Sequence, residues 1–474
     1  MMVALGDARL SGDEVIETSF GTLRLEHSFP DEASSALLFD QFDVQRAAQA
    51  YVWALPLAGF AAWRQRAAET FGVEGFGDFV VYDSLREKRG IVTANLTTPY
   101  IINFTNLADG PVLIDYPTGP TAGGVLDFWQ RPVVDLGLTG PDGGQGGGYV
   151  VLGPGQDAAA FDGSDRTVVR SQTLNVFIAF RVLTQDAQAM AAAKAGLKLS
   201  RAGSDPVPVR FIEGVDLEWS ATPARGLPFW QDLAAVLEEE PVREVDKGFM
   251  AMLEPLGVLK GRPFDPDERQ RRILTEGAAL GELFVRNLQV NPRYTTPYWA
   301  DTSWYKLIDF VIEQETENIL QIDQRATLFY EAVTTTKGMV HPTPGTGQAY
   351  MTAKRDSDGR LLRADRSYRV HVPAEVPVAQ FWSLSLYSED TRRPYDNGGT
   401  DIRSVSLDSR DDQLKFNDDG SIDLYIGPTA PQEAAAANWM KTSGQDGWFV
   451  YFRLYAPTEP FFDKTWTLPD IHVV

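Results

Sequence analysis

Four side chains that could do chemistry lie close together beside a glycine-rich segment. They are Asp127, Trp129, Arg131 and Asp135. In an extended chain alternate residues point to one side, so Asp127, Trp129 and Arg131 would share a face. Two carboxylates near an arginine could act as general acid and general base, because burial raises a carboxyl pKa and a cation lowers it. We therefore predict Asp127, Asp135 and Arg131 as catalytic residues, and Trp129 as a stacking plane for the substrate. Asp–Arg pairs that only hold a loop to a sheet are the alternative.

A second group of candidates lies in the C-terminal third of the chain. Arg392 and Arg403 belong to a polar loop that follows a predicted strand ending at Tyr387. Such a loop suits the recognition of an anionic or hydroxyl-bearing ligand, although the arginines could equally anchor the loop through salt bridges. Trp382 could stack on a substrate or fill a core. We predict all three as substrate-binding residues.

The chain lacks the patterns of several common cofactor and metal sites. The glycine-rich run from Gly143 to Gly148 leads into a strand at Tyr149 rather than into a helix, so a tight turn is favoured over a phosphate cradle. The four histidines are far apart in the sequence, and there are no cysteines. We predict no cofactor and no metal, although a catalytic triad built from distant residues stays open.

Charge and composition limit the classes of partner. The net charge is −22 over 474 residues, which argues against nucleic acid and anionic membranes as partners. The N-terminus shows no signal-peptide pattern, and no run of 18 apolar residues occurs. The sequence therefore predicts a cytoplasmic protein without a membrane span that acts on a small-molecule substrate or ligand. A homo-oligomer is left open.

Hydrophobic periodicity predicts a mixed order of elements. A buried helix is expected over residues 43–71, kinked or split at Pro56. Strands are expected at residues 112–116, 149–152, 368–372, 380–387 and 448–455. Residues 228–325 look helical, with Asp265 as an N-cap before Pro266, Glu268 completing a capping box, and a further helix over residues 303–323.

The fold class expected from this order is α+β, with two jelly-roll-like β-sandwich domains and a helical insert between them. The expected boundaries are residues 1–225 for the N-terminal β-rich domain, 226–328 for the insert and 329–474 for the C-terminal sandwich.

Several blocks of sequence together resemble a known pair of families. They are SFGTLRLEHSFPDEAS, AYVWALPL, GPDGGQGGGY and FRLYAPTEPFFDKTWTLPDI. The chain is similar to tandem proteins of the domain-of-unknown-function families 1254 (about residues 75–205) and 1214 (about residues 360–460). The resemblance implies β-sandwich domains related to jelly rolls and joined by helices. It implies no settled reaction, substrate or catalytic set.

One stretch departs from the family pattern. Where the family commonly has Asn-Asn-Asp-Thr before a Pro-Tyr pair, this chain has Asn95, Leu96, Thr97 and Thr98 before Pro99 and Tyr100. Asn95 and Tyr100 fit the pattern, and we predict both as substrate-binding residues. The acidic position is Thr97, so a family role for that carboxylate does not carry over.

These observations lead to two main hypotheses of function. The first is a small-molecule enzyme, a hydrolase using carboxylate acid–base chemistry at a pocket near the domain junction. The alternative is a non-catalytic binding protein for a carbohydrate or a lipid-like ligand. A scaffold that only assembles with itself is a weaker third.

Overall fold

The computed structural model describes residues 2–184, 186–213, 218–431 and 433–474. The fold is mixed α+β, and the chain divides into two compact units. The first unit comprises residues 1–55, 224–238 and 242–287, and the second comprises residues 56–223, 239–241 and 288–474. No helix among the described residues is long and apolar enough to cross a membrane.

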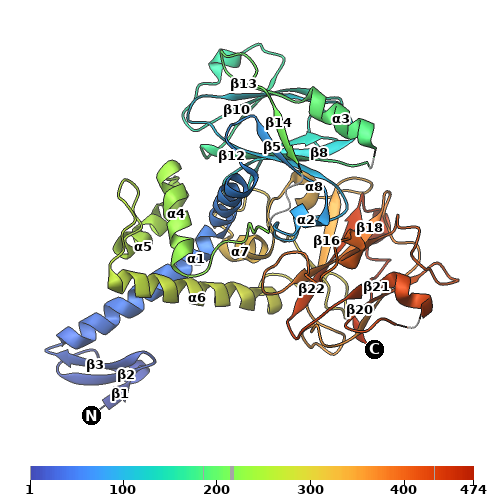
Figure 1. Cartoon of the computed structure of the whole chain (residues 1–474). Helices are drawn as coiled ribbons and strands as arrows, with labels where there is room; N and C mark the ends of the chain where they lie inside the picture. Colours follow the sequence, from blue (N-terminus) through green and yellow to red (C-terminus); the bar gives the residue numbers. More distant parts are fainter. Residues whose placement is uncertain (1, 185, 214–217, 432) are drawn as a thin grey trace. The chain divides into compact units, whose positions relative to one another are not determined.

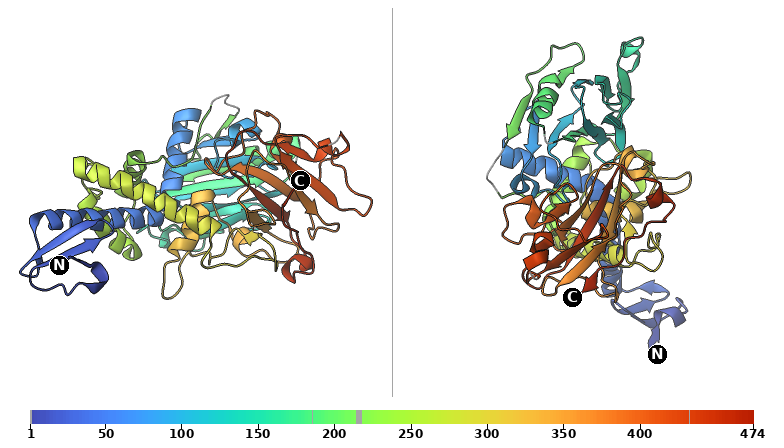
Figure 2. Two further views of the ribbon diagram at one scale, coloured as in Figure 1. Left: turned by 90° about the horizontal axis from the view of Figure 1, so that it is seen from below. Right: turned by 90° about the vertical axis from the view of Figure 1, so that its right-hand side faces the viewer.

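The first unit begins with a small sheet beside the start of a long helix (Figure 2). The sheet has the order β1-β2-β3-β4, with strands Met2–Ala4, Glu14–Thr18, Gly21–Glu26 and Phe29–Pro30. Its buried side chains Ile16, Leu23 and Leu25 pack with Leu38 of helix α1, Glu32–Phe71. Alternation of buried and exposed residues along β3 explains why one face of this sheet is apolar.

Helices complete the first unit. They are α4 (Leu227–Glu239), α5 (Lys247–Leu253) and α6 (Glu268–Val290). Helix α6 packs closely on α1, because a Cβ atom at Gly277 would lie 2.2 Å from the Cβ of Ala47. A Cβ at Gly281, one turn later, would lie 2.7 Å from the ring of Tyr51. Glycine at both positions therefore permits the close approach of the two backbones.

The N-terminal half of the second unit contains two sheets around one core (Figure 1). The larger sheet has the order β14-β5-β6-β12-β8-β9, with strands Arg210–Glu213, Asp78–Tyr82, Tyr100–Asn106, Asn175–Val182, Thr121–Asp127 and Pro132–Gly137. The smaller has the order β11-β10-β7-β13, with strands Thr167–Arg170, Gly147–Leu152, Val112–Tyr116 and Lys198–Arg201. Helix α3, Ala187–Gly196, contributes Ala193 to the same core.

The C-terminal half of the second unit also contains two sheets. One has the order β15-β16-β22-β18-β19, with strands Tyr305–Lys306, Gln348–Ala353, Trp448–Tyr455, Trp382–Ser388 and Ser406–Asp408. The other has the order β21-β20-β17-β23, with strands Trp439–Lys441, Ile422–Gly427, Tyr368–Val372 and His472–Val473. Short helices α2 (Leu85–Lys88), α7 (Ile322–Glu331), α8 (Lys337–Val340) and α9 (Glu459–Phe462) lie between or after strands.

Several expected strands and the buried helix over residues 43–71 are confirmed, whereas the helix expected over residues 303–323 is absent. Strands β7, β10, β17, β18 and β22 lie where alternation predicted them. Residues 303–323 form no long helix: Leu307 donates its amide to the carbonyl of Tyr350 instead, at 3.0 Å, as an edge of β16. Helix α1 starts at Glu32, earlier than expected, and runs through Pro56 without splitting.

The capping box of α6 lies two residues after the expected one. Asp267 accepts from the amide of Gln270 at 2.8 Å, and the Gln270 side chain accepts from the amide of Asp267 at 3.0 Å. Asp267 is therefore the N-cap, and the helix begins at Glu268. The predicted N-cap Asp265 is therefore wrong, and Asp267, which has Gln270 three residues later, forms the box.

Candidate functional site

A cavity of about 100 Å³ lies inside the second unit, between its N-terminal and C-terminal halves. One side is formed by β6, β8 and β12, and the other by β16 and β22. Residues 91–95 and 332–336 contribute to the rest of the wall. Most of the lining is apolar, and the polar groups are few, as in small-molecule sites.

Strand alternation explains how the N-terminal half lines this cavity. On β6, Ile101 enters the core between the two sheets, whereas Tyr100 and Ile102 face the cavity. On β12, Val176 and Ile178 belong to that core, whereas Ala179 and Arg181 line the cavity. The same sheet thus fills its own core with one face and forms a wall of the cavity with the other.

Strand β22 divides its two faces in the same way. Val450 and Phe452 belong to one face, and Phe452 stacks on Trp382 with ring centroids 5.5 Å apart. Tyr451 and Arg453 belong to the opposite face and line the cavity. Every residue of this strand is buried, so Arg453 is carried into the interior of the protein.

Arg453 is a buried cation without a carboxylate partner among the described residues. Its side chain is 2 % exposed, and it donates to the hydroxyl of Ser385 at 3.0 Å and to the carbonyl of Thr93 at 3.2 Å. Its Nε atom has no hydrogen-bond acceptor in the described part of the chain. The rings of Tyr350, Tyr387 and Tyr451 lie 5.1–5.5 Å from its guanidinium carbon, but no carboxylate among the described residues balances the buried charge, so this guanidinium favours an anion in the cavity.

Tyr100 and Arg181 add further donors at the cavity wall. The hydroxyl of Tyr100 accepts from the amide of Asn95 at 2.8 Å, while its own proton has no acceptor within the described ranges. Arg181 donates to the hydroxyl of Thr98 at 3.3 Å and is half-buried. Arg181 and Arg453 are the charged residues that line the cavity in the described chain.

The tyrosines around Arg453 remain protonated. Burial raises the pKa of Tyr100 and of Tyr387, although the positive charge of Arg453 opposes this rise. Burial also raises the pKa of Tyr350 well beyond its ordinary value. Phenol groups that keep their protons can donate hydrogen bonds and do not neutralise the arginine.

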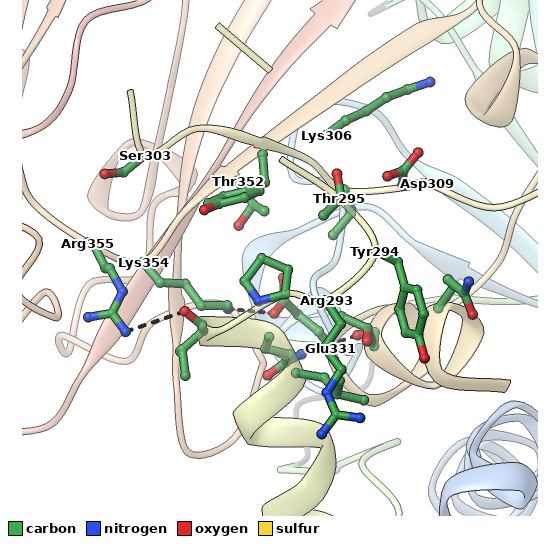
Figure 3. A pocket seen from close by; sticks show the side chains of 18 residues that line it. Arg293, Tyr294, Thr295, Ser303, Lys306, Asp309, Glu331, Thr352, Lys354 and Arg355 are labelled. Carbon is green, nitrogen blue, oxygen red and sulfur yellow. Dashed lines mark hydrogen bonds and ion pairs between the residues drawn. The ribbon is translucent and has the colours of Figure 1, made fainter. Parts of the chain in front are cut away.

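Behind Tyr451 a buried ion pair reaches a second pocket. The Tyr451 hydroxyl donates to Glu331 at 2.6 Å, and the other carboxylate oxygen of Glu331 lies 2.5 Å from the ammonium of Lys354. Burial alone would lower the pKa of Lys354, but the carboxylates of Glu331 and Glu389 outweigh it and raise the pKa. Glu331 and Lys354 also line a pocket of about 110 Å³, shown with Arg355 and Tyr294 in Figure 3.

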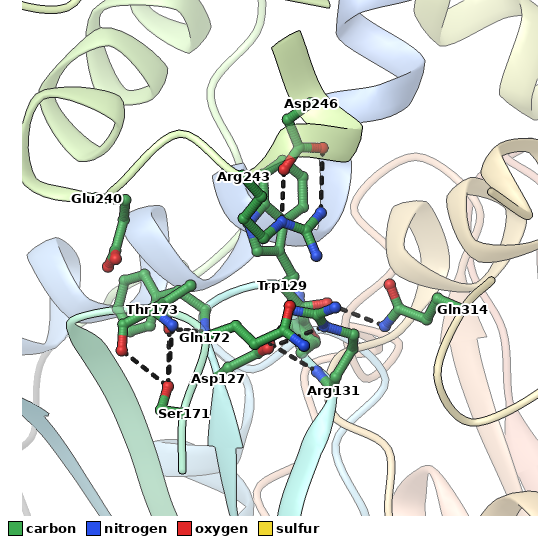
Figure 4. Close-up of polar contacts among 12 residues, drawn as sticks. Asp127, Trp129, Arg131, Ser171, Gln172, Thr173, Glu240, Arg243, Asp246 and Gln314 are labelled. Atoms are coloured by element: carbon green, nitrogen blue, oxygen red, sulfur yellow. Dashed lines mark hydrogen bonds and ion pairs between the residues drawn. The ribbon is translucent and has the colours of Figure 1, made fainter. Parts of the chain in front are cut away.

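The predicted catalytic pair Asp127 and Arg131 forms a closed clamp at the turn between β8 and β9 (Figure 4). Arg131 Nη2 lies 2.6 Å from Asp127, and the amide of Arg131 also donates to this carboxylate at 3.0 Å. The turn presents Gln130, whose side-chain oxygen accepts from the amide of Thr334 at 2.8 Å. Trp129 is 3 % exposed, and its carbonyl accepts from Gln314 at 2.9 Å. None of these predicted residues lines either pocket in the described chain.

Asp135 supports a segment of the cavity wall from behind. It is buried and accepts from the amide of Lys337 at 3.3 Å, at the start of α8. Burial raises its pKa, and the amides of Lys337 and Gly338 partly oppose this. Thr336 and Met339, at and within α8, line the cavity, so Asp135 lies one step removed from it.

Asn95 and Tyr100 are the predicted substrate-binding residues that the structure places on the cavity wall. The side-chain Nδ2 of Asn95 donates to the hydroxyl of Tyr455 at 2.7 Å, and its side-chain oxygen accepts from the hydroxyl of Thr97 at 2.8 Å. Thr97 also lies 2.9 Å from the Tyr455 oxygen. Thr97 therefore places a neutral hydroxyl inside a hydrogen-bonded cluster.

The remaining predicted binding residues lie away from the cavity lining. Trp382 stacks on Phe452 on the opposite face of its sheet. Arg392 lies over the ring of Tyr330 at 4.1 Å, and Arg403 pairs with Asp411 and donates to the carbonyl of Ala437 at 2.9 Å. The ion pair of Arg403 is the salt-bridge anchoring that was the alternative for this loop.

Sequence reasoning did not single out Arg453, Tyr451, Arg181 or Glu331. A signal was present in Tyr451, Arg453 and Tyr455, because an arginine between tyrosines two residues away is unusual in an otherwise apolar strand. The alternation along this strand indicates its apolar face, but it does not indicate what the opposite face, with Tyr451 and Arg453, lies against.

Comparison with known proteins gives two family matches and a fold relative. Residues 76–201 match the model described as protein of unknown function DUF1254, and residues 347–459 match protein of unknown function DUF1214. No curated protein matches the chain. The crystal structure of the VPA0106 protein from Vibrio parahaemolyticus is similar, with a TM-score of 0.55 and 16% identity over 91% of this chain and 100% of that one.

A structure of an uncharacterised protein from Burkholderia cenocepacia also matches, with a TM-score of 0.42 and 13% identity over 93% of this chain and 97% of that one. The likeness to the Vibrio protein concerns the fold alone. The two family matches follow one another along the chain, as the sequence blocks predicted. The chain is a tandem protein of the DUF1254 and DUF1214 families.

Proposed function

We propose that this protein binds a small organic carboxylate in the cavity between its DUF1254 and DUF1214 halves. The observation that carries the proposal is Arg453, a buried guanidinium on the cavity wall with no carboxylate partner among the described residues. A bound carboxylate would accept from Arg453 Nε and from the hydroxyl of Tyr100. Charge-assisted hydrogen bonds of this kind are among the stronger ones in proteins.

The volume of the cavity supports a small ligand. An engineered cavity of roughly 150 Å³ holds benzene, so a cavity of about 100 Å³ suits a compact molecule with no more heavy atoms than benzene. A sugar ring with its hydroxyl groups is larger than this, which favours a short acid over a carbohydrate.

Hydrolysis by paired carboxylates has less support at this cavity. Its described lining contains no aspartate or glutamate, and Asp127 is held by Arg131 outside the lining. Binding of an acid therefore accounts for more of the geometry than the hydrolase hypothesis does. The jelly-roll assignment, the cytoplasmic location and a homo-oligomer stay predictions from the sequence; the paired sheets of each half support the first of them.

Calorimetric titration with propionate and with propionamide tests the proposal. The two molecules have nearly the same size, but only propionate carries a charge for Arg453 to bind. We expect propionate to bind at least about tenfold more tightly, because hydrogen bonds to charged groups contribute about 1.5–3 kcal/mol. Equal affinities, or no binding of either molecule, would contradict the proposal.

The pH dependence of propionate binding gives a further prediction through Lys88. This lysine is 1 % exposed, its ammonium lies 6.0 Å from the ring centroid of Tyr100, and burial lowers its pKa to about 8. The charges of Asp83 and Glu87 oppose this lowering of the pKa, while Arg181 adds to it. A bound anion favours the charged ammonium, so affinity should be full below pH 8 and fall as the pH rises through 8.

The expected fall in affinity is roughly tenfold, because opposite charges about 10 Å apart interact by roughly 1.5 kcal/mol at an effective dielectric constant of about 20. Lys88→Met should bind propionate more weakly at pH 7 and show no such fall between pH 7 and 9. An unchanged pH profile in this variant would show that Lys88 does not act on the ligand.

A further inference from the structure

The hydroxyl groups at the cavity differ in what they can offer a ligand. A phenol has one proton to donate and lone pairs that accept. At Tyr100 the amide of Asn95 occupies a lone pair, at 2.8 Å, and the proton is free to donate. Tyr100, Arg181 and Arg453 therefore form a side of the cavity that donates.

The Tyr451 hydroxyl can accept a hydrogen bond from a ligand but has no proton to donate to it. Its proton is directed to Glu331 at 2.6 Å, and an ionised carboxylate can only accept, so the sense of this hydrogen bond is fixed. The ion pair of Glu331 with Lys354, at 2.5 Å, favours the ionised carboxylate. The Tyr451 oxygen therefore has only lone pairs left for a ligand in the cavity.

Tyr350 is a weaker case of the same kind. Its hydroxyl donates to the side-chain oxygen of Gln348, but an amide can turn over and present its donor instead. A carboxylate has no such alternative. Tyr451 is thus the lining hydroxyl with the most firmly assigned accepting role.

The two sides lie close enough for one small ligand. Tyr451 and Arg453 are two residues apart on β22 and point to the same face, about 6–7 Å apart along the strand. The guanidinium carbon of Arg453 lies 5.1 Å from the ring centroid of Tyr451. A compact molecule with no more heavy atoms than benzene can therefore reach both groups.

We propose that the ligand is a small hydroxy acid, with its carboxylate on Arg453 and Tyr100 and its hydroxyl donating to Tyr451. This inference rests on the proposed binding of a carboxylate and adds its substrate class. Tyr451 is the residue that selects a hydroxyl over hydrogen at this position, and Glu331 positions Tyr451 by accepting its hydrogen bond. Specificity arises because a ligand without a donor leaves the Tyr451 oxygen unpaired in a buried site.

The test compares lactate, propionate and 2-fluoropropionate by calorimetric titration of the full chain. Fluorine is close in size to a hydroxyl but has no proton to donate. We expect wild-type protein to bind at least one enantiomer of lactate about tenfold more tightly than propionate. It should bind 2-fluoropropionate no better than propionate. This arm needs no variant, so it does not depend on any substitution being tolerated.

Two matched variants assign the preference to one residue. Tyr451→Phe should bind lactate and propionate equally, because it removes the oxygen that distinguishes them. Tyr387→Phe is the control, because Tyr387 lies on the same sheet face but donates to the carbonyl of Ala94 at 2.6 Å and is outside the described lining. It should keep the wild-type preference.

The outcomes separate the two proposals. If wild type binds propionate and lactate equally, or if Tyr451→Phe keeps the preference, the hydroxy-acid inference is wrong and carboxylate binding stands. Binding of 2-fluoropropionate as tightly as lactate would likewise overturn the inference alone. If neither acid binds more tightly than propionamide, both proposals are wrong.

Discussion

Replacing Arg453 with methionine is expected to weaken propionate binding by at least about 30-fold. Truncating one partner of a buried, charged hydrogen bond costs about 2–5 kcal/mol of binding free energy, and 1.4 kcal/mol corresponds to a factor of ten. Calorimetric titration of the variant measures this loss directly. Arg453→Lys should recover part of the affinity, because it keeps the charge but loses the planar fork.

The Arg453→Met variant should remain folded. In the free protein the substitution removes a buried charge that no carboxylate balances, which stabilises, and its contacts with three tyrosine rings and hydrogen bonds to Ser385 and Thr93, which destabilises. These effects oppose one another, so we expect the free energy of unfolding to change by less than about 1.5 kcal/mol. Thermal melting without ligand measures this change.

Arg410→Met is the matched control for Arg453→Met. Arg410 lies over the ring of Phe381 at 3.6 Å and pairs with Asp408 at 3.0 Å, outside the described lining. It should bind propionate as wild type does. An Arg453→Met protein that is folded and binds propionate at full strength would contradict the assigned role of this residue.

The ion pair of Glu331 and Lys354 predicts the largest effect on stability. Their side chains are 3 % and 7 % exposed and lie 2.5 Å apart. Glu331→Leu or Lys354→Met alone should destabilise the protein by about 3–5 kcal/mol, because each leaves a buried charge without its main partner. The residual contact of Lys354 with Glu389, at 3.4 Å, places Glu331→Leu toward the lower end.

The double variant should be more stable than either single variant. Replacing both partners removes both charges, and the remaining cost is about 1 kcal/mol for the Tyr451 hydroxyl that loses its acceptor. Urea unfolding of wild type, both single variants and the double variant measures this coupling. Additive effects of the two substitutions would contradict a buried pair.

A surface pair provides the control for this cycle. Arg363 and Asp365 lie 2.8 Å apart, with side chains 47% and 36% exposed. Their coupling should be much smaller than that of Glu331 and Lys354, because water screens exposed pairs. A coupling as large as that of Glu331 and Lys354 would show that burial does not set the difference.

Strands whose neighbours alternate regularly could be predicted from the sequence. Strand β17, for example, alternates buried residues with Arg369 and His371, and its pattern needs no knowledge of its partners. Residues 303–323 could not be predicted in this way. The apolar residues of this stretch, Leu307, Phe310 and Val311, have helical spacing. However, the backbone amide of Leu307 donates to the carbonyl of Tyr350 at 3.0 Å, and that of Val311 donates to the side chain of Gln321 at 2.9 Å.

The candidate site depends on contacts between distant parts of the sequence. Asn95 and Tyr100 could be predicted because they lie in one recognisable stretch. Arg453 could not, since its role follows from the neutral character of its neighbours Ser385 and Thr93, which are remote in the sequence. Asp127 and Arg131 attracted a catalytic interpretation because sequence shows their proximity but not that they satisfy each other.

A crystal structure of the protein soaked with propionate tests the central claim most directly. The account predicts a carboxylate within hydrogen-bond distance of Arg453 Nε and the Tyr100 hydroxyl, with the short alkyl chain among the apolar residues of the cavity. A cavity that stays empty at saturating propionate, or a propionate whose carboxylate lies away from Arg453, would contradict it.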